Sequence, residues 1–176
     1  MGLRKTHLWD MVGAYPVCTA CGSRKIARDA LSAWNMATQA WELHSILDGF
    51  CCEDCGCTAL PAWKLDAEFR RKRIQRLNDA VRHGDPSNAT IVVTAGLKAE
   101  GEDKLHKIVD AIRCFSDFSE DNDPHGEHDC GAVEHNGEKV FWKIDYFDHA
   151  LKMHSPDAAN PSVTHRVLTL MLASEY

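Results

Sequence analysis

Two short cysteine motifs constrain the fold of this chain more than any other feature. The segments Cys18-Thr19-Ala20-Cys21-Gly22 and Cys52-Glu53-Asp54-Cys55-Gly56 share the pattern C-x-x-C-G. The two-residue spacing lets both thiolates of a tight turn point at one ion, and the glycine relieves the backbone where amide groups approach the sulfurs. Two such turns supply four thiolates, the closed tetrahedral set of a structural zinc site. The spacing therefore predicts a Zn²⁺ ion bound by Cys18, Cys21, Cys52 and Cys55.

The remaining cysteines test this interpretation. Six of the eight cysteines lie in the first 57 residues, and paired C-x-x-C spacing indicates metal rather than disulfides in a cytosolic chain. A cysteine cluster without metal and an iron site of similar geometry are the alternatives. Pairing Cys51 with Cys55 breaks the two-residue spacing, so we interpret Cys51 and Cys57 as non-ligands. Metal binding should supply on the order of 10 kcal/mol of the folding free energy of this small domain.

The composition and the first residues suggest where the chain is found. Hydrophobic residues make up 44% and charged residues 26% of the 176 residues, which is typical of a soluble globular protein. No run of about 18 apolar residues could span a membrane. Residues 1–18 lack the apolar core and the cleavage site of a secretory signal, so we expect a cytoplasmic protein.

The net charge of −6 is unevenly distributed along the chain. Residues 1–65 carry six Lys/Arg and six Asp/Glu, residues 66–89 carry six and four, and residues 90–176 carry eight and sixteen. These segments therefore have net charges of 0, +2 and −8. The acidic C-terminal part should repel a nucleic-acid backbone, which favours a protein partner over DNA or RNA.

The cysteine-rich part, residues 1–65, is expected to be a β-rich zinc-ribbon-like domain. Alternating residues after Cys21 predict two strands joined near Asn35–Gln39, although a helix is the alternative. Trp34 and Trp41 flank this short connection and form a plausible cross-strand pair. We place the domain boundary near Pro61–Asp66.

Residues 66–176 predict a compact α+β domain with about three helices and a small antiparallel sheet. Apolar periodicity indicates helices over residues 66–83, closed by Gly84-Asp85-Pro86, and over residues 102–115. The β-branched segment 89–97 is expected to be a buried strand.

The clearest hairpin covers residues 131–147. Asn136-Gly137 is the preferred two-residue turn, because both residues tolerate positive φ. This turn places His135 opposite Glu138 and puts Val140 and Trp142 on the core face.

The last segment, residues 160–176, is expected to be a terminal helix with Pro161 in its first turn. A strand from Val167 to Leu172 is the alternative.

The helix over residues 66–83 carries several basic side chains. Arg71, Lys72, Arg76 and Arg82 lie mainly away from its apolar stripe. The simpler interpretation is a solvated face. A nucleic-acid contact through Arg71, Lys72 and Arg76 is the alternative.

The segment Asp121–Gly131 is rich in potential ligands but has no recognised metal-binding spacing. Asp-Asn-Asp-Pro is strong turn chemistry, because Asx side chains bond their own backbone. Glu127, His128 and Asp129, with Asp145 on the following hairpin, are the catalytic candidates of a metal-dependent hydrolase or nuclease. The Glu-x-Lys pattern of such nucleases is absent, and cross-strand ion pairing is the simpler interpretation of these charges. Cys130 beside Asp129 is a poor nucleophile, because acidic neighbours raise a thiol pKa.

The C-terminal segments DNDPHGEHDCGAVEHNGEKVFWKIDYFD and SPDAANPSVTHRVLTLMLASEY resemble an uncharacterised bacterial family, domain of unknown function 3768. The resemblance covers roughly Arg70 to Tyr176 and implies an alphaproteobacterial origin, often on mobile DNA, with no established activity. Two positions depart from the family pattern, which has aromatic residues at His125 and Cys130. The positions that match it are Asn122, Asp123, Pro124, Gly126, Glu127, His128, Asp129, Gly131, Trp142, Lys143, Asp145 and Tyr146.

Taken with the charge, the resemblance implies a non-enzymatic binding or accessory protein in bacterial DNA or mobile-element biology, with inhibition of a host system as one role. Its ribbon would be an interaction module. The acidic domain would contact protein more readily than nucleic acid, while the ribbon or the basic helix could still bind DNA or RNA. The alternative, from another class, is the metal-dependent hydrolase or nuclease.

Overall fold

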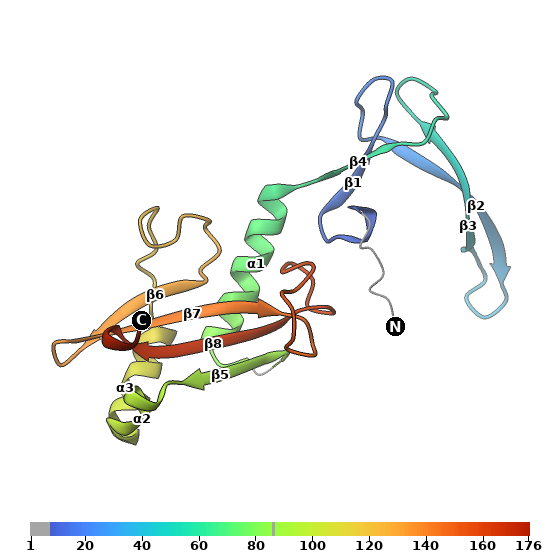
Figure 1. Ribbon diagram of the computed structural model, residues 1–176. Coiled ribbons are helices and arrows are strands. Elements are labelled where there is room, and N and C mark those ends of the chain that lie inside the picture. The colour runs from blue at the N-terminus through green and yellow to red at the C-terminus, as the bar shows by residue number, and fades with distance from the viewer. Residues whose placement is uncertain (1–7, 86) are drawn as a thin grey trace. The chain divides into compact units, whose positions relative to one another are not determined.

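The computed structural model describes residues 8–85 and 87–176. It divides into two compact units, Met1–Asp66 and Ala67–Tyr176 (Figure 1). The predicted helix stop includes Pro86, which lies outside the described residues. Each unit is described by itself below.

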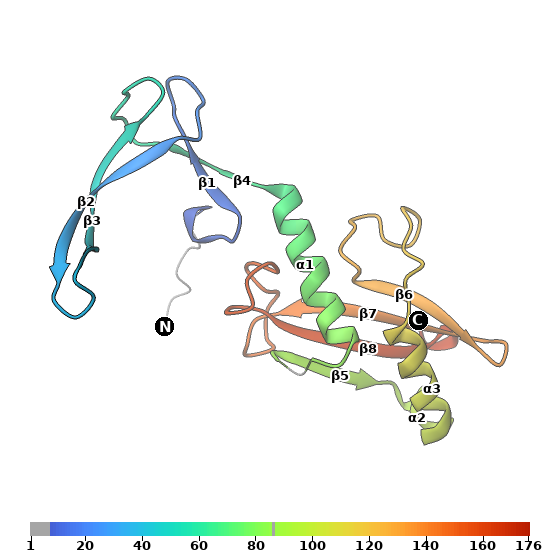
Figure 2. The ribbon, with the colours of Figure 1, turned by 180° about the vertical axis from the view of Figure 1, so that it is seen from behind.

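Unit 1 consists of two small antiparallel sheets. Its elements are η1 (Leu8–Asp10), β1 (Ala14–Val17), β2 (Ile26–Asn35), β3 (Ala40–Cys52) and β4 (Ala62–Leu65). Strand β1 pairs with β4, and β2 pairs only with β3. Figure 2 shows β2 and β3 side by side as a long hairpin.

The predicted pair of strands in unit 1 is confirmed. The turn joins Asn35 to Ala40, where the Asn35 Oδ1 atom accepts the Ala37 N–H at 2.9 Å and Gln39 takes a positive φ of 55°. Trp34 lies opposite Trp41, and their rings meet edge to face with centroids 5.8 Å apart. The tryptophan pair predicted from the sequence therefore lies next to the tip of the hairpin.

Unit 2 is built around a four-stranded sheet. Its elements are α1 (Ala67–Arg82), β5 (Ala89–Val93), α2 (Ala95–Ala99), α3 (Glu102–Arg113), β6 (Cys130–His135), β7 (Glu138–Phe147), β8 (His165–Leu172) and η2 (Ala173–Glu175). The strand order is β5-β8-β7-β6, antiparallel except for the parallel pair β5–β8. The predicted α+β class with three helices is confirmed.

The hairpin β6–β7 has the predicted turn and register. Asn136 and Gly137 have φ angles of 53° and 79°, and His135 lies opposite Glu138. Alternate residues of β7 then face the core, where Val140, Trp142 and Ile144 are at most 4% exposed.

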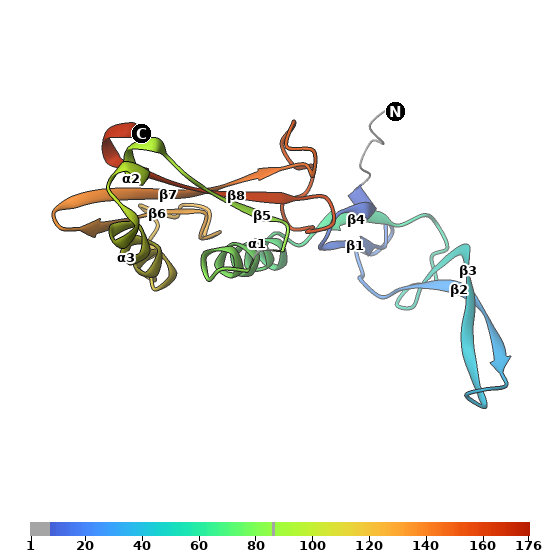
Figure 3. The same ribbon diagram turned by 90° about the horizontal axis from the view of Figure 1, so that it is seen from below.

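Helices α1 and α3 lie on one side of this sheet (Figure 3). The apolar stripe of α3 buries Ile108 and Ile112 against the sheet, as its period of 3.6 residues predicts. The core of unit 2 consists of Val81, Leu97, Ile108, Ile112, Val140, Trp142, Ile144, Leu168 and Leu170. None of the helices within residues 8–85 and 87–176 is both long enough and apolar enough to cross a membrane.

The prediction of a terminal helix is wrong, because residues 165–172 form the strand β8. Buried and partly exposed residues alternate along it, with Arg166, Leu168 and Leu170 inside. Strand β8 pairs with β7 on one side and β5 on the other, so its backbone groups are satisfied within the sheet. The apolar spacing that suggested a helix also fits a strand, and the neighbouring strands decided between them.

The strand predicted over residues 89–97 is shorter and less buried than expected. It ends at Val93, and residues 95–99 form α2. As an edge strand, β5 leaves Ile91 and Val92 exposed. The β-branched residues of β5 therefore indicated a strand correctly but did not indicate that the strand is buried.

Candidate functional site

The first cysteine motif forms a tight turn directly after β1. The Cys18 N–H group donates to the Ser23 carbonyl at 2.8 Å, and the Gly22 N–H group donates to the Cys18 carbonyl at 2.9 Å. Gly22 has a φ of 75°, which favours glycine over other residues. A Cβ atom at this position would meet no neighbouring atom, so the reason for glycine is the backbone conformation and not a lack of space.

The second motif repeats this geometry at the end of β3. The Cys52 N–H group donates to the Cys57 carbonyl at 2.9 Å, and the Gly56 N–H group donates to the Cys52 carbonyl at 2.7 Å. Gly56 has a φ of 69°. The two motifs are thus two copies of one turn, as their shared sequence pattern predicts.

The two turns bring four sulfur atoms together. The Sγ atoms of Cys18, Cys21, Cys52 and Cys55 all lie within 4.8 Å of one another and could hold a metal ion. The Cys18–Cys55 and Cys21–Cys52 sulfur pairs are each 3.6 Å apart. Cys51 and Cys57 lie outside this group, so the structure brings together the same four cysteines that the spacing selected.

The electrostatics of the four thiols show why a cation suits them. Hydrogen bonds from the backbone N–H groups of Cys21 and Ala20 lower the pKa of Cys18 to about 6. At Cys55 the Cys57 amide acts in the same direction, but the neighbouring thiols of Cys21 and Cys18 outweigh it and raise the pKa to about 12. Four thiolates at this distance repel one another, and a bound cation removes that repulsion.

A polar latch, formed by Ser23, Lys25 and Asp54, joins the two turns. The Ser23 hydroxyl and the Lys25 ammonium donate to the two carboxylate oxygens of Asp54, at 2.7 and 2.8 Å. Lys25, followed by Ser23, lowers the pKa of Asp54. Sequence reasoning missed this latch, although Asp54 lies inside one motif and Ser23 directly follows the other.

The hairpin β2–β3 next to these turns exposes an unusual amount of apolar side chain. Met36 at the tip is 75% exposed and Trp41 is 69% exposed. Together the exposed apolar residues of this hairpin, here called the hairpin patch, are Leu31, Trp34, Met36, Trp41, Leu43, Ile46 and Leu47. Apolar patches of this kind mark interaction sites in folded proteins.

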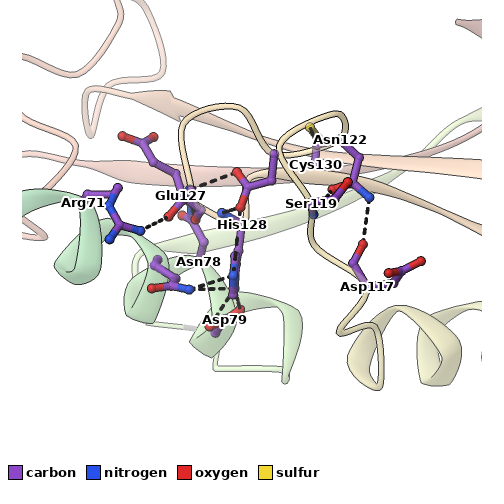
Figure 4. A network of polar contacts seen from close by, with 12 residues as sticks. Arg71, Asn78, Asp79, Asp117, Ser119, Asn122, Glu127, His128 and Cys130 are labelled. Carbon is purple, nitrogen blue, oxygen red and sulfur yellow. Dashed lines mark hydrogen bonds and ion pairs between the residues drawn. The ribbon is translucent and has the colours of Figure 1, made fainter. Parts of the chain in front are cut away.

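In unit 2, the loop before β6 is organised by a buried carboxylate. Asp123 is 6% exposed, and its two oxygens accept the N–H groups of Glu127 at 2.9 Å and His128 at 3.1 Å (Figure 4). The turn chemistry predicted for Asp-Asn-Asp-Pro is thus present, since an Asx side chain bonds the backbone that follows it.

The His128 side chain is held between α1 and the loop. Its Nδ1 atom is 3.0 Å from the Asp79 carboxylate, and its Nε2 atom is 2.7 Å from the Gln75 amide nitrogen (Figure 4). Phe118 stacks on the ring with centroids 3.6 Å apart. With the proton on Nδ1, the ring donates to Asp79 and accepts from Gln75, so both nitrogens are used within the fold.

Glu127 is part of a network centred on Asn78, a fully buried residue of α1. The Asn78 amide donates to the Glu127 carbonyl at 2.9 Å and to the Tyr146 hydroxyl at 2.7 Å, and its oxygen accepts from Arg166. The Tyr146 hydroxyl donates to the Glu127 carboxylate at 3.1 Å. Burial raises the pKa of the Glu127 carboxyl despite this bond, and burial also raises the pKa of Tyr146.

The four catalytic candidates do not converge. His128 faces α1, whereas Asp129 and Asp145 line a groove together with Cys130. Asp145 pairs with Lys143 at 3.0 Å. Across residues 8–85 and 87–176, the four-cysteine group is the one set of three or more His, Cys, Asp or Glu side chains placed to hold a metal.

The pKa of the Cys130 thiol is shifted in the direction that its acidic neighbours predict, with burial as the larger cause. Burial, followed by the charge of Asp129, raises the pKa of its thiol to about 11.

The basic side chains of α1 are largely engaged in contacts within the unit. Glu68 accepts from both Arg71 at 2.7 Å and Lys72 at 3.2 Å. Arg76 Nε donates to the Lys72 carbonyl at 3.4 Å.

Arg82 does not lie on a solvated face, which corrects the sequence-based interpretation. It is 4% exposed and donates to Asp79 and to the carbonyls of Ile112 and Phe115. Its guanidinium thus caps carbonyls at the C-terminal end of α3. It also lies over the Trp142 ring, 5.2 Å from the centroid. Arginine suits this position because its planar group satisfies several acceptors at once.

Comparison with known families finds a match in the C-terminal part of the chain. Comparisons with curated proteins and with solved structures found no match. The match to a protein family begins at Val93, which is later than the resemblance implied, so α1 lies outside it. Residues 93–175 match the family described as "Protein of unknown function (DUF3768)", so the C-terminal part of this chain is similar to that family.

Proposed function

We propose that this chain is a non-enzymatic zinc-ribbon protein that binds a protein partner through the hairpin patch. The exposed apolar surface of β2–β3, beside a cluster of four cysteines, is the observation that carries the proposal. The fold of unit 1 holds this surface in place, and metal binding would maintain that fold.

The geometry of the cysteines supports zinc as the metal. A Zn–S distance of about 2.3 Å places the sulfurs of a tetrahedral site about 3.8 Å apart. The Cys18–Cys55 and Cys21–Cys52 pairs, at 3.6 Å, are close to this value. Four thiolates and no open coordination position are typical of a structural zinc site rather than a catalytic one.

The charge of the hairpin favours protein over nucleic acid as its partner. Residues 26–52 contain one basic residue, Arg28, and three acidic residues, Asp29, Glu42 and Asp48. Arg28 is already paired with Asp48 at 3.3 Å. A nucleic-acid site needs cations to neutralise phosphates, whereas buried tryptophan side chains contribute strongly to protein interfaces.

The proposed setting is bacterial DNA or mobile-element biology, where inhibition of a host system is one role for an acidic accessory protein. This setting rests on what the resemblance of the C-terminal segments implies, and the charge of −8 over residues 90–176 is compatible with an acidic accessory protein. The contacts of His128 and the separation of His128 from Asp145 give no support to a hydrolase or nuclease.

Elemental analysis of the full chain tests the metal. We expect one Zn²⁺ per chain in the wild type and in the control Cys51→Ser, and none in Cys52→Ser. A second metal that depends on His128 would favour the enzyme instead.

Site-specific crosslinking tests the partner. A photo-crosslinking amino acid at Met36 should couple in cells to one protein, which is then purified for affinity measurements. Trp41→Ser should weaken that binding at least about tenfold, because a central tryptophan contributes about 2 kcal/mol or more. Leu60→Ser is the control, since Leu60 is equally exposed in unit 1 but lies outside the hairpin. Equal effects of both substitutions, or hairpin-dependent binding to DNA alone, would refute the proposal.

A further inference from the structure

Unit 2 contains a groove on the face of its sheet opposite the core. Val140, Trp142 and Ile144 of β7 point into the core, so the residues between them face the other way. Helices α1 and α3 lie on the core side (Figure 3). The groove has a volume of about 640 Å³ and extends past β6 to the loop that contains Asp117 and Asn122. A volume of this size is within the range of small-molecule sites, roughly 300–1,000 Å³.

The middle of the groove is apolar and aromatic. Phe141 of β7 lies opposite Met171 of β8, and the Tyr176 ring lies beside Phe141 with centroids 5.4 Å apart. These groups offer a surface for an aromatic or aliphatic body.

The charged groups of the groove leave an excess of carboxylate. Lys143 and Asp145 neutralise each other at 3.0 Å. Within the described residues, Asp117 and Asp129 make no ion pair with a cation, and Lys139 at the other end lies over the Phe141 ring. The field of the surrounding acidic segment, with a charge of −8 over residues 90–176, adds to the attraction for a cation.

A buried donor next to the groove is also incompletely satisfied. Trp142 is 1% exposed, and its Nε1 atom has no acceptor in the part of the chain that the structure describes. Trp142 is among the residues that line the groove, and its indole packs on Gly131, where a Cβ atom would lie 2.7 Å from the ring. The indole N–H signal of Trp142 can therefore be followed when a ligand is added.

We propose that this groove binds an amphipathic organic cation, with an ammonium or guanidinium group on an apolar or aromatic body. The cationic group lies at the end formed by Asp117 and Asp129. The body packs on Phe141 and Met171. This site is separate from the hairpin patch and does not depend on the proposed function of unit 1.

Two probes of matched shape test the proposal. Phenethylamine and 3-phenylpropionate have similar bodies and opposite charges, and each is titrated into the ¹⁵N-labelled full chain while amide and indole signals are followed by NMR. Phenethylamine should give saturable shifts at Cys130, Phe141 and the Trp142 indole. The carboxylate should bind at least about fivefold more weakly, and added salt should reduce binding of the amine.

Two substitutions localise the site. Asp129→Asn should weaken binding of phenethylamine at least about fivefold, because it removes an ionic partner. Phe141→Leu should weaken the binding of both probes, since it removes the ring. Asp103→Asn, on the exposed face of α3, is the matched control and should change nothing. Tighter binding of 3-phenylpropionate, no saturable shift with the amine, or equal behaviour of the two Asp→Asn variants would overturn the proposal.

Discussion

The two units are stabilised in different ways. Among the described residues of unit 1, the buried apolar side chains are Val17, Cys18 and Cys52, and two of these are in the cysteine group. Unit 2 instead buries a continuous core of nine residues beneath its sheet. In unit 1 the four-cysteine group, which could hold a metal ion, lies where unit 2 has a core, and the hairpin exposes apolar side chains. In unit 2 the core is complete, and the polar network around Asn78 fixes the loop on its surface.

Removing the metal should produce the largest difference between the units. Chelation, or Cys52→Ser, should unfold unit 1, because structural zinc supplies on the order of 10 kcal/mol to a domain with so little core. Unit 2 should keep its fold. Hydrogen exchange measured amide by amide would show lost protection in residues 26–52 and retained protection in β7 and β8. Protection that persists in residues 26–52 after chelation would mean that unit 1 folds without metal.

Breaking the network in unit 2 should have the next largest effect. Asn78→Ala removes the bonds to the Glu127 carbonyl, the Tyr146 hydroxyl and the Arg166 Nε, so each of these groups loses one partner in the interior of unit 2. We expect unit 2 to lose about 2–4 kcal/mol of stability in urea denaturation. Lys72→Ala on the exposed side of the same helix is the control, with a change below about 0.5 kcal/mol. A similar loss in both variants would show that the network contributes little.

Changing one charge in that network should have the smallest effect, and its size depends on pH. Burial raises the folded-state pKa of Glu127 above its unfolded value, so the ionised carboxylate weakens unit 2 at neutral pH. The stability linked to its protonation is fully present below about pH 4 and is lost as the pH rises through the folded pKa.

Glu127→Gln keeps an oxygen that accepts from Tyr146 but removes the charge. Unit 2 should therefore gain less than about 1 kcal/mol at pH 7, and the difference should vanish near pH 4. Urea denaturation at both pH values would measure it, with the exposed Glu134→Gln as the control. A loss of stability at pH 7 would show that the Glu127 charge is favourable in the fold.

Local patterns predicted the elements whose form depends on neighbouring residues alone. Asn136-Gly137 fixed one hairpin and its register, because both residues tolerate positive φ. The four metal-site cysteines were identified by spacing alone, because two thiolates two residues apart in one turn meet at a point. The helix α3 was predicted in the same way, from apolar residues spaced three and four apart.

Other features depended on residues far apart in the chain. Residues 165–172 have a spacing that fits both a helix and a strand, and pairing with β5 and β7 made them a strand. The pattern along α1 suggested that Arg82 is solvated. In the structure its guanidinium is buried and donates to the Ile112 carbonyl at the end of α3, thirty residues later in the chain. His128 was a candidate ligand until α1 supplied Asp79 and Gln75 to its two nitrogens.

The sequence by itself determined the four-cysteine group, the hairpin at Asn136-Gly137 and the acidity of unit 2, because these follow from spacing, turn chemistry and composition. Only the tertiary structure decided which polar residues serve the fold and which face the solvent. It placed His128 in the network with α1, and Asp129 with Lys143 and Asp145 in the groove on the other face of the sheet. The physical reason is that a side chain's role depends on its partners, and in unit 2 those partners come from distant segments of the chain.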